Sequence, residues 1–205
     1  VDLLILATST ADYQISSSAP IVAYELGCGK IPAFDLNAVC AGFVYGFSVA
    51  AGFLESGMYK NCLLIGADVY SRILNWEDRN SCVLFGDGAG AVVLTEGDNI
   101  KATKMSASCN WDRLYQKHEL QYSPYNSKPN SNLPLVMHGQ DVFMFATKAA
   151  IRDISNVLKQ SGIKPDEVNH FLIHQANLRI IKSIKDFLRQ PEEKFPLNIH
   201  RYGNT

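Results

Sequence analysis

The chain has 205 residues, of which 47% are hydrophobic and 19% charged, a composition typical of a globular protein with a sizeable core. Its 19 lysine and arginine residues nearly balance 20 aspartate and glutamate residues, and this near-zero net charge argues against a nucleic-acid coat protein. No apolar run approaches the roughly 18 residues of a membrane span, so we do not expect an integral membrane protein.

The two ends of the chain do not look like the ends of a fold. The sequence starts at Val1, inside an apolar run and without a methionine, and it stops at Thr205 in a turn-like sequence. We therefore expect it to be the middle of a longer polypeptide, and an upstream targeting segment is compatible with that expectation.

The first half alternates short apolar runs with helical patterns, starting with a buried strand at residues 1–7. A serine-rich cap precedes a helix that runs to Leu26 and is closed by Gly27. Residues 41–56 are apolar on nearly every side, which predicts a buried helix, and Gly57 is its expected C-terminal cap. Further strands are predicted at residues 32–36, 62–67, 81–85 and 91–95.

Small residues recur at two places where backbones are expected to approach closely. Gly42, Gly46 and Ala50 form one stripe of the predicted buried helix, which lets another backbone come near. The run from Gly86 to Gly90 joins two predicted strands, whereas a dinucleotide-binding fingerprint lies between a strand and a helix. We therefore assign these glycines to close backbone crossings and reject a nucleotide site.

The second half opens with a change of character. Residues 108–135 are rich in Ser, Asn, Tyr, Pro and Lys and lack an apolar period, which predicts a long loop. Helices are predicted over 141–160 and 178–187, with a short strand at 171–173 between them. Strands that alternate with helices indicate α/β layers in which helices cover sheets.

A faint internal repeat relates the two halves. Residues 1–6 resemble residues 168–173, and each segment precedes a helix and a Pro-started extended run, at residues 32–40 and 196–204. A true duplication would place Cys40 and Asn204 at related strand ends of two pseudo-symmetric halves.

Cys40 is the first candidate for chemistry, because it lies between a predicted strand and an apolar helix. Free N–H groups and the helix dipole at that position favour a thiolate and could hold a developing oxyanion. The alternative is a buried structural cysteine, which is our interpretation of Cys28, Cys62, Cys82 and Cys109. The odd number of cysteines and the absence of a CxxC pair predict no disulfide framework or zinc site, so a reducing compartment is expected.

Two further polar positions could face a ligand crevice. His174 follows a predicted strand, where side chains of α/β sheets tend to meet ligands, although a structural histidine is the alternative. Asn204 lies in a turn-like sequence and is weak evidence by itself. On the helix after His174, the residues Arg179, Lys182 and Lys185 form one basic strip, for which a solvated face is the default interpretation.

Four motifs in register resemble the thiolase superfamily, specifically 3-oxoacyl-[acyl-carrier-protein] synthase III. They are the sequences DLNAVCAGF, FGDGAGA, HQANLRI and GNT, which begin at Asp35, Phe85, His174 and Gly203. The resemblance implies a thiolase-like duplicated five-layer α-β-α-β-α fold, truncated at both ends. Residues 1–100 would form the N-terminal half with the nucleophile, and residues 101–205 the C-terminal half with the histidine and asparagine.

The resemblance also implies a catalytic set formed by Cys40, His174 and Asn204. In this family the cysteine takes an acyl group from acyl-CoA, and the enzyme then condenses it with malonyl-carrier protein as CO₂ is lost. The cysteine supplies covalent catalysis, while the histidine and asparagine would stabilise the enolate formed on decarboxylation. The expected substrates are acyl-CoA and malonyl-carrier protein, and neither a metal nor a cofactor is expected.

Substrate-binding positions follow from the same resemblance. Arg79 matches an arginine that contacts the CoA nucleotide, and Phe143, Ala176 and Asn177 match residues of the pantetheine tunnel. Ile15 occupies a primer-chamber position that a phenylalanine often fills.

The resemblance gives the basic strip of Arg179, Lys182 and Lys185 a partner, the acidic acyl carrier protein. Two positions depart from the family pattern: Asn80 replaces a glycine, and Met144 stands where a basic residue would help to dock the carrier. A cytoplasmic homodimer is expected, without nucleic-acid or membrane partners.

Three alternatives remain open. One is a relative diverted to polyketide or other secondary metabolism, and another is a non-catalytic partner in a dimer. The third is a Cys-His-Asn protease, whose nucleophile would need a different fold context. The presence of Cys40, His174 and Asn204 together disfavours the non-catalytic partner.

Overall fold

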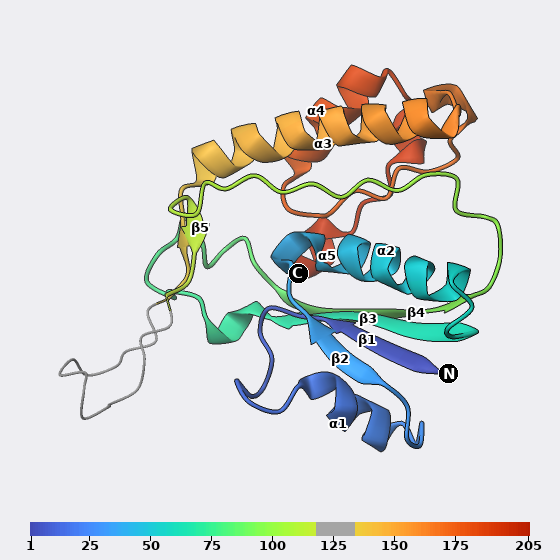
Figure 1. The fold of residues 1–205 in the computed structure, drawn as a ribbon. Helices are drawn as coiled ribbons and strands as arrows, with labels where there is room; N and C mark the ends of the chain where they lie inside the picture. Colours follow the sequence, from blue (N-terminus) through green and yellow to red (C-terminus); the bar gives the residue numbers. More distant parts are fainter. Residues whose placement is uncertain (118–133) are drawn as a thin grey trace.

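The computed structural model describes residues 1–117 and 134–205. A four-stranded sheet is covered on one face by α1 (Ser18–Glu25) and on the other by α2 (Gly42–Glu55). The helices α3 (Gly139–Ser161) and α4 (Leu178–Leu188) form a further layer beyond α2 (Figure 1). The order is therefore helix, sheet, helix and helix pair, in agreement with the predicted α/β layers.

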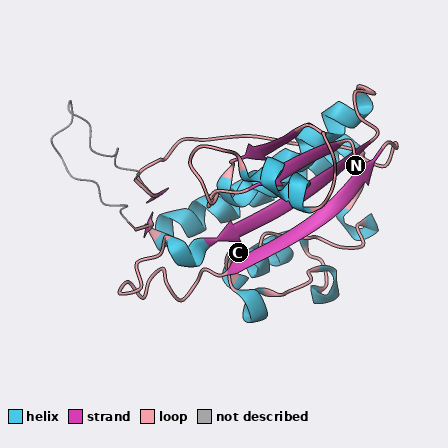
Figure 2. Ribbon diagram, turned by 90° about the horizontal axis from the view of Figure 1, so that it is seen from below, coloured by secondary structure: helices cyan, strands magenta, loops and turns pink. Residues whose placement is uncertain are grey.

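The strands of the sheet are arranged in the order β2-β1-β3-β4. They comprise β1 (Leu3–Ala7), β2 (Ala33–Leu36), β3 (Asn61–Val69) and β4 (Asp87–Thr95). Strand β1 pairs in parallel with β2 and β3, while β4 runs antiparallel to β3. Figure 2, seen from below, shows the long strands side by side across the helices. All of β1 is buried, as its continuous apolar run predicts.

The predicted small-residue stripe of α2 is confirmed. A Cβ atom added to Gly46 would lie 2.6 Å from Cδ1 of Leu64, and one added to Gly42 would lie 3.2 Å from Cβ of Ala7. Ala50, on the same stripe, is fully buried. The small side chains therefore let α2 sit directly on β1 and β3, which fixes the start of the helix over the carboxyl ends of these strands.

The predicted strand at residues 81–85 is wrong. Asp78 holds this segment in consecutive turns, because its carbonyl oxygen accepts from the N–H groups of Ser81 and Cys82. The strand instead begins at Asp87 and contains most of the glycine run, which the sequence placed in a connection. The close crossing was predicted correctly, since a Cβ atom on Gly86 would collide with the carbonyl oxygen of Tyr202.

The second half packs around the apolar face of α4. Ile180, Ile181 and Ile184 are buried there, and the rings of Phe171 and Phe195 stack with centroids 5.0 Å apart. Both predicted helices of this half are confirmed. Since apolar residues recur every three to four positions in α4, burial of one face accounts for its formation.

The predicted strand at residues 171–173 is not formed. Within the described ranges, one bond joins it to another backbone group, from Phe171 N–H to the carbonyl oxygen of Lys194, and no strand lies beside it. The predicted extended run at 196–204 contains a short helix, α5 (Ile199–Tyr202). The repeat is therefore visible in element order, but the described residues do not build a second large sheet.

The region predicted as a long loop contains one small ladder. Strand β5 (Leu114–Tyr115) pairs with β6 (Val136–Met137), and the rest of the predicted loop, residues 118–133, lies outside the described residues. Across the described ranges, no helix has the length and apolar character needed to cross a membrane.

Candidate active site

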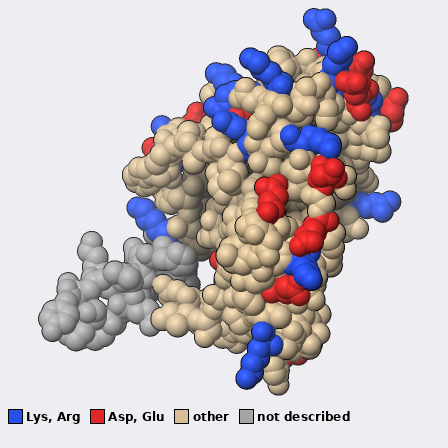
Figure 3. Space-filling view, turned by 45° about the vertical axis from the view of Figure 1, so that its right-hand side comes forward, with Lys and Arg blue, Asp and Glu red and all other residues tan. Residues whose placement is uncertain are grey.

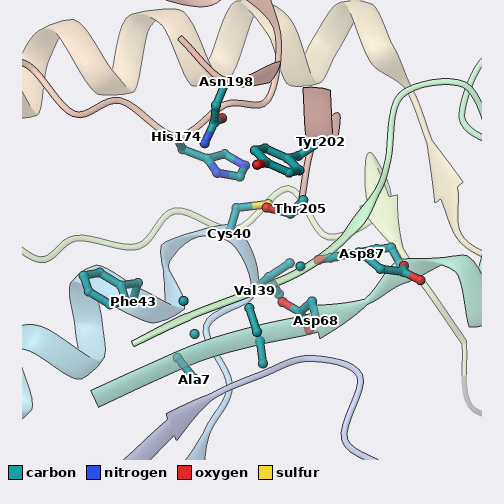
Figure 4. A pocket seen from close by; sticks show the side chains of 16 residues that line it. Ala7, Val39, Cys40, Phe43, Asp68, Asp87, His174, Asn198, Tyr202 and Thr205 are labelled. Carbon is teal, nitrogen blue, oxygen red and sulfur yellow. The ribbon is translucent and has the colours of Figure 1, made fainter. Parts of the chain in front are cut away.

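A cavity of about 660 Å³ opens at the carboxyl ends of β1 and β3, where the end of the chain crosses the start of β4. Cys40 and His174 both line it, although 134 positions separate them in the sequence. The close-up in Figure 4 shows the two side chains facing each other, with Asn198 and Tyr202 beside the histidine and Asp68 on the sheet side. The fold therefore brings the first two predicted catalytic residues together.

Cys40 sits in a single 3₁₀ turn, Val39–Ala41, immediately before α2. Val39 has a positive φ of 49°, which is strained for a β-branched residue. The turn connects β2 to α2 and places the Cys40 side chain in the wall of the cavity, where it is accessible. Nothing in the sequence signals this backbone, because valine is among the residues least expected there.

The thiolate-favouring effect expected at the helix start is outweighed at Cys40. Although Cys40 is accessible from the cavity, the protein atoms around its sulfur displace water and raise the pKa of the thiol above its ordinary value, and the nearby carboxylate of Asp68 raises it further. A backbone hydrogen bond and the side chain of Tyr70 act in the opposite direction but do not reverse the shift. The thiol is therefore the resting form at neutral pH.

His174 is also shifted toward its neutral form. Burial lowers the pKa of the imidazole, and an interaction with the side chain of Asn204 opposes that effect in part. The imidazole can then donate one N–H and accept at the other nitrogen. The cavity thus pairs a neutral thiol with a neutral imidazole at physiological pH.

Asn204 lies next to His174 and is 8% exposed. Its backbone forms a bridge to the first half: its N–H donates to the carbonyl oxygen of Leu84 at 2.8 Å, and its own carbonyl oxygen accepts from Gly86 N–H at 2.7 Å. Its side-chain Oδ1 is buried without a hydrogen-bond partner in the described ranges. A buried, unpaired amide oxygen is uncommon, and a catalytic role is one explanation for such a group.

The predicted substrate-binding residues lie outside this cavity. Arg79 is exposed in the turns before β4, and Ile15 is 88% exposed. Phe143 and Ala176 pack against the apolar face of α4, and Asn177 caps that helix by accepting from Arg179 N–H at 2.8 Å. The structure therefore brings none of these five side chains to Cys40.

The predicted basic strip lies on α4 and is mixed in charge. Arg179 and Lys182 are exposed, while Lys185 pairs with Glu192 at 3.5 Å. Lysine and arginine side chains gather toward the top of the view in Figure 3, and acidic side chains lie among them. The positive electrostatic potential of this surface is therefore weaker than its number of basic residues alone would give.

Several cavity residues were missed by the sequence analysis. Asp68 and Tyr70 follow the apolar part of β3, and a polar residue at the end of a buried parallel strand is the signal that could have found them. Asn198, Tyr202 and Thr205 come from the last turn of the chain, where no periodicity distinguishes them.

The chain matches two family models, described as 3-oxoacyl-[acyl-carrier-protein (ACP)] synthase III over residues 34–112 and its C-terminal part over residues 158–205. Curated beta-ketoacyl-[acyl-carrier-protein] synthase III proteins from Helicobacter pylori and Fusobacterium nucleatum are 39% and 43% identical over the whole chain. The chain spans about 64% of the length of these relatives.

Solved structures agree with the sequence matches. The 3-oxoacyl-[acyl-carrier-protein] synthase III of Aquifex aeolicus superposes with a TM-score of 0.89 at 39% identity, covering 100% of this chain and 64% of that one. A priming beta-ketosynthase from the R1128 polyketide pathway gives 0.88 at 30% identity, with 100% and 62% covered. The predicted thiolase-like α/β fold class is confirmed by these neighbours, and the chain belongs to the 3-oxoacyl-[acyl-carrier-protein] synthase III family.

Proposed function

We propose that this chain carries the reaction centre of a condensing enzyme that initiates fatty acid synthesis. Cys40 would accept an acyl group from acyl-CoA, and the acyl group would then condense with malonyl-carrier protein to give 3-oxoacyl-carrier protein and CO₂. The observation that carries the proposal is the meeting of Cys40 and His174 in one cavity, with Asn204 next to the histidine.

In the first half-reaction, Sγ of Cys40 attacks the thioester carbonyl carbon of acyl-CoA. The S–H proton is lost, the carbon–sulfur bond to CoA breaks, and the CoA thiolate takes up a proton as it leaves. Because the pKa of Cys40 is raised, little thiolate exists beforehand, so the proton leaves as the attack proceeds. The N–H groups at the start of α2, which begins two residues after Cys40, would donate to the developing oxyanion.

In the second half-reaction, the bond between the malonyl carboxylate and Cα breaks, CO₂ leaves, and the electron pair enters an enolate. Neutral His174 and the amide of Asn204 would each donate an N–H to the thioester oxygen on which charge develops. The enolate carbon then attacks the acyl carbonyl, and Sγ of Cys40 leaves. The lowered pKa of His174 suits this role, because the imidazole is already neutral.

The division of the chain follows the same chemistry. We assign residues 1–100 to the half that places the nucleophile and residues 101–205 to the half that places His174 and Asn204. The bridge between Phe85 and Asn204 joins the two halves beside the cavity. The proposal also includes a carrier-docking role for the basic strip, a homodimer and a cytoplasmic location. It further assigns acyl-CoA contacts to five residues: Arg79, Phe143, Ala176, Asn177 and Ile15.

The test is acylation of the full chain by acetyl-CoA and by longer acyl-CoAs, read by intact mass and peptide mapping. The acyl group is expected on Cys40 alone, with Cys40→Ala as the unlabelled control. Cys62 is the internal comparison, because it is fully buried and its pKa is raised to about 11. Label on Cys62 or Cys82, with none on Cys40, would disprove the proposal.

The second candidate is a priming enzyme of polyketide or related secondary metabolism. It is favoured by the likeness to the priming beta-ketosynthase of the R1128 pathway over the whole chain. Profiling primers and acceptors separates the two: transfer to an acceptor other than a malonyl-loaded carrier protein of fatty acid synthesis would favour this candidate.

A further inference from the structure

We propose that Asp68 makes the cavity selective for acyl groups that carry no negative charge, so that Cys40 takes up neutral primers in preference to dicarboxylic ones. The proposal deepens the proposed function and rests on it in taking Cys40 as the acyl acceptor. Asp68 and Cys40 line the same cavity, and Figure 4 shows Asp68 on the sheet side of the cysteine. Asp68 would thus be a specificity-determining residue that acts through its charge.

The side chain of Asp68 projects from the face of the sheet that borders the cavity. Residues two positions apart on a strand share a face, so Asp68 lies on the same face of β3 as Gly66. A Cβ atom added to Gly66 would lie 3.4 Å from the ring of Phe43 in α2. Gly88 is the partner of Asp68 on β4, and a Cβ atom added there would lie 3.0 Å from the side chain of Thr205. Phe43 and Thr205 both line the cavity, so all three observations place Asp68 on its side of the sheet.

The chain that follows β1 holds the Asp68 carboxylate in place. Oδ1 accepts from the N–H and the hydroxyl of Ser9, at 2.8 and 2.9 Å. It also accepts from the hydroxyls of Thr10 and Thr8, at 2.9 and 3.3 Å. An ionised carboxylate is the form that accepts from several donors at once. The negative charge therefore has a fixed position at the end of the sheet.

The cavity has no cation to balance this charge. Among the described residues, its lining contains the carboxylates of Asp68 and Asp87 and neither lysine nor arginine. The hydroxyl and the N–H of Ser71 donate to Asp87 and hold the pKa of that carboxyl below its ordinary value. Burial lowers the pKa of His174, so the imidazole adds no positive charge at neutral pH. An acyl group at Cys40 therefore meets a negatively charged cavity.

Arg72, in the turn that follows β3, does not reverse this sign. Its side chain lies outside the cavity lining, and its guanidinium donates to Oδ1 of Asp12 at 2.7 Å. The effect on the nucleophile agrees with a negative environment. Burial raises the pKa of the Cys40 thiol, and the carboxylate of Asp68 raises it further, as a nearby negative charge does.

The charge separates two classes of acyl group. A malonyl or succinyl group has a carboxylate a short distance from the carbonyl that Cys40 attacks, so this carboxylate enters the cavity with the carbonyl. Like charges repel more strongly where protein atoms replace part of the water. Acetyl, propionyl and butyryl groups carry no such charge. The cavity should therefore admit neutral primers faster than dicarboxylic ones of the same length.

This selectivity would keep the two half-reactions in order. A malonyl group transferred to Cys40 would occupy the nucleophile in place of a primer. In the second half-reaction the malonyl group stays on its carrier, its thioester oxygen meets His174 and Asn204, and its carboxylate is released as CO₂. The charge of Asp68 therefore bears most strongly on the acylation of Cys40.

The first experiment compares alkylation of Cys40 by neutral iodoacetamide and by anionic iodoacetate in the full chain, followed on the Cys40 peptide by mass spectrometry. Both reagents lose iodide to the same thiolate, so the ratio of their rates at one pH cancels any change in the ionisation of Cys40. Asp68→Asn keeps the size and an acceptor oxygen but removes the charge. It should lower the preference for iodoacetamide about fivefold, because a like-charge repulsion is lost. Asp68→Ser is the second neutral variant if Asp68→Asn does not fold.

The second experiment compares acylation of Cys40 by butyryl-CoA and by succinyl-CoA, which have the same chain length and differ in charge. Asp68→Asn should raise the rate with succinyl-CoA severalfold relative to the rate with butyryl-CoA. Asp2→Asn is the matched control, because Asp2 lies at the other end of the sheet and accepts from the N–H groups of Lys60 and Asn61, at 3.1 and 3.3 Å. Both ratios should equal those of the wild-type chain in this control, and thermal unfolding verifies the fold of each variant.

An unchanged alkylation ratio in Asp68→Asn would overturn the proposal, and so would an equal change in Asp2→Asn. A lowered alkylation ratio without a change in the ratio of the two acyl-CoA rates would also overturn it, since the charge would then not select primers. A wild-type chain that takes up neither acyl group would contradict the proposed function instead. The alkylation ratio uses no acyl-CoA, so in that case it still decides whether Asp68 sets the charge preference at Cys40.

Discussion

The two walls of the cavity are built in different ways. On one wall, Cys40 rests on β1 and β3, whose core residues Leu3, Ile5 and Leu64 are almost completely buried. On the other, His174 follows a segment without a strand partner in the described residues, and Asn204 is held by the bridge to Phe85. The nucleophile is thus fixed by a sheet, whereas the groups opposite it depend on a few polar bonds.

Gln175 illustrates how the second wall is held. Its side-chain Oε1 accepts from the N–H of Asn198 at 3.0 Å, and its Nε2 donates to the carbonyl oxygen of Ile173 at 2.9 Å. One side chain therefore ties the segment before His174 to the start of α5. Because the two walls are held differently, acylation of Cys40 and decarboxylation of the malonyl group should respond to different substitutions.

The strongest test of this contrast replaces His174 or Asn204 with alanine. Decarboxylation of malonyl-carrier protein should fall by about 10²–10³-fold, because donors to the developing enolate oxygen are lost. Acylation of Cys40 should change by less than about tenfold, since its sulfur is placed by the other wall. The two rates are measured separately, by CO₂ release and by intact mass. Loss of acylation as complete as in Cys40→Ala would refute the division.

A backbone substitution tests the bridge that joins the walls. Gly86→Ala would drive a Cβ atom into the carbonyl oxygen of Tyr202, whereas Gly90→Ala, in the strand β4 that follows, meets no atom within 4 Å. We expect Gly86→Ala to lower stability by about 1–3 kcal/mol and to reduce condensation about tenfold. Thermal unfolding and condensation assays read both effects. Equal behaviour of the two variants would mean that the crossing has no role.

The pH dependence of acylation tests whether Cys40 and His174 are both neutral at physiological pH. Because the folded-state pKa of Cys40 is raised, acylation should increase with pH, by up to about tenfold per unit, beyond pH 8.5, where an ordinary thiol is half ionised. His174, with its lowered pKa, stays neutral across that range. Single-turnover acylation between pH 6 and 10 measures the profile, and a plateau below pH 8 would contradict the raised pKa.

The smallest effect is expected at the basic strip. Reversing Arg179 and Lys182 to Glu should raise the KM for malonyl-carrier protein severalfold, and high salt should reduce the difference, because exposed charges are screened over about 8 Å. Acylation by acyl-CoA should change far less. Lys30→Glu with Lys60→Glu makes the same change in net charge on the other half. Equal damage from both pairs would assign the effect to net charge alone.

The sequence predicted best where apolar spacing decides the structure. The buried run of β1, the stripe of Gly42 and Gly46, and the amphipathic face of α4 each fix which side is buried. The strand predicted at 81–85 failed because Asp78 captures its N–H groups, and Val83 is 64% exposed. Apolar content alone does not reveal such local hydrogen bonds.

The candidate site divides in the same way. Cys40, His174 and Asn204 could be named because motifs mark them, and the first two meet in one cavity. The raised pKa of Cys40 could not be predicted, since it depends on burial and on Asp68, which lies 28 positions away. Nor could the contact between the hydroxyl groups of Ser9 and Tyr70, which lie 61 positions apart in the sequence.

The left-handed backbone conformation of Val39 means that thermal stability and catalysis favour different residues at position 39. Glycine or asparagine would adopt that conformation with less strain, so a library screened only for survival of heating would enrich those residues at position 39. A library screened for acyl transfer would instead retain whatever keeps the thiol directed into the cavity. Selection for thermal stability alone is therefore expected to lower the rate of acyl transfer through substitutions in the turn that holds Cys40.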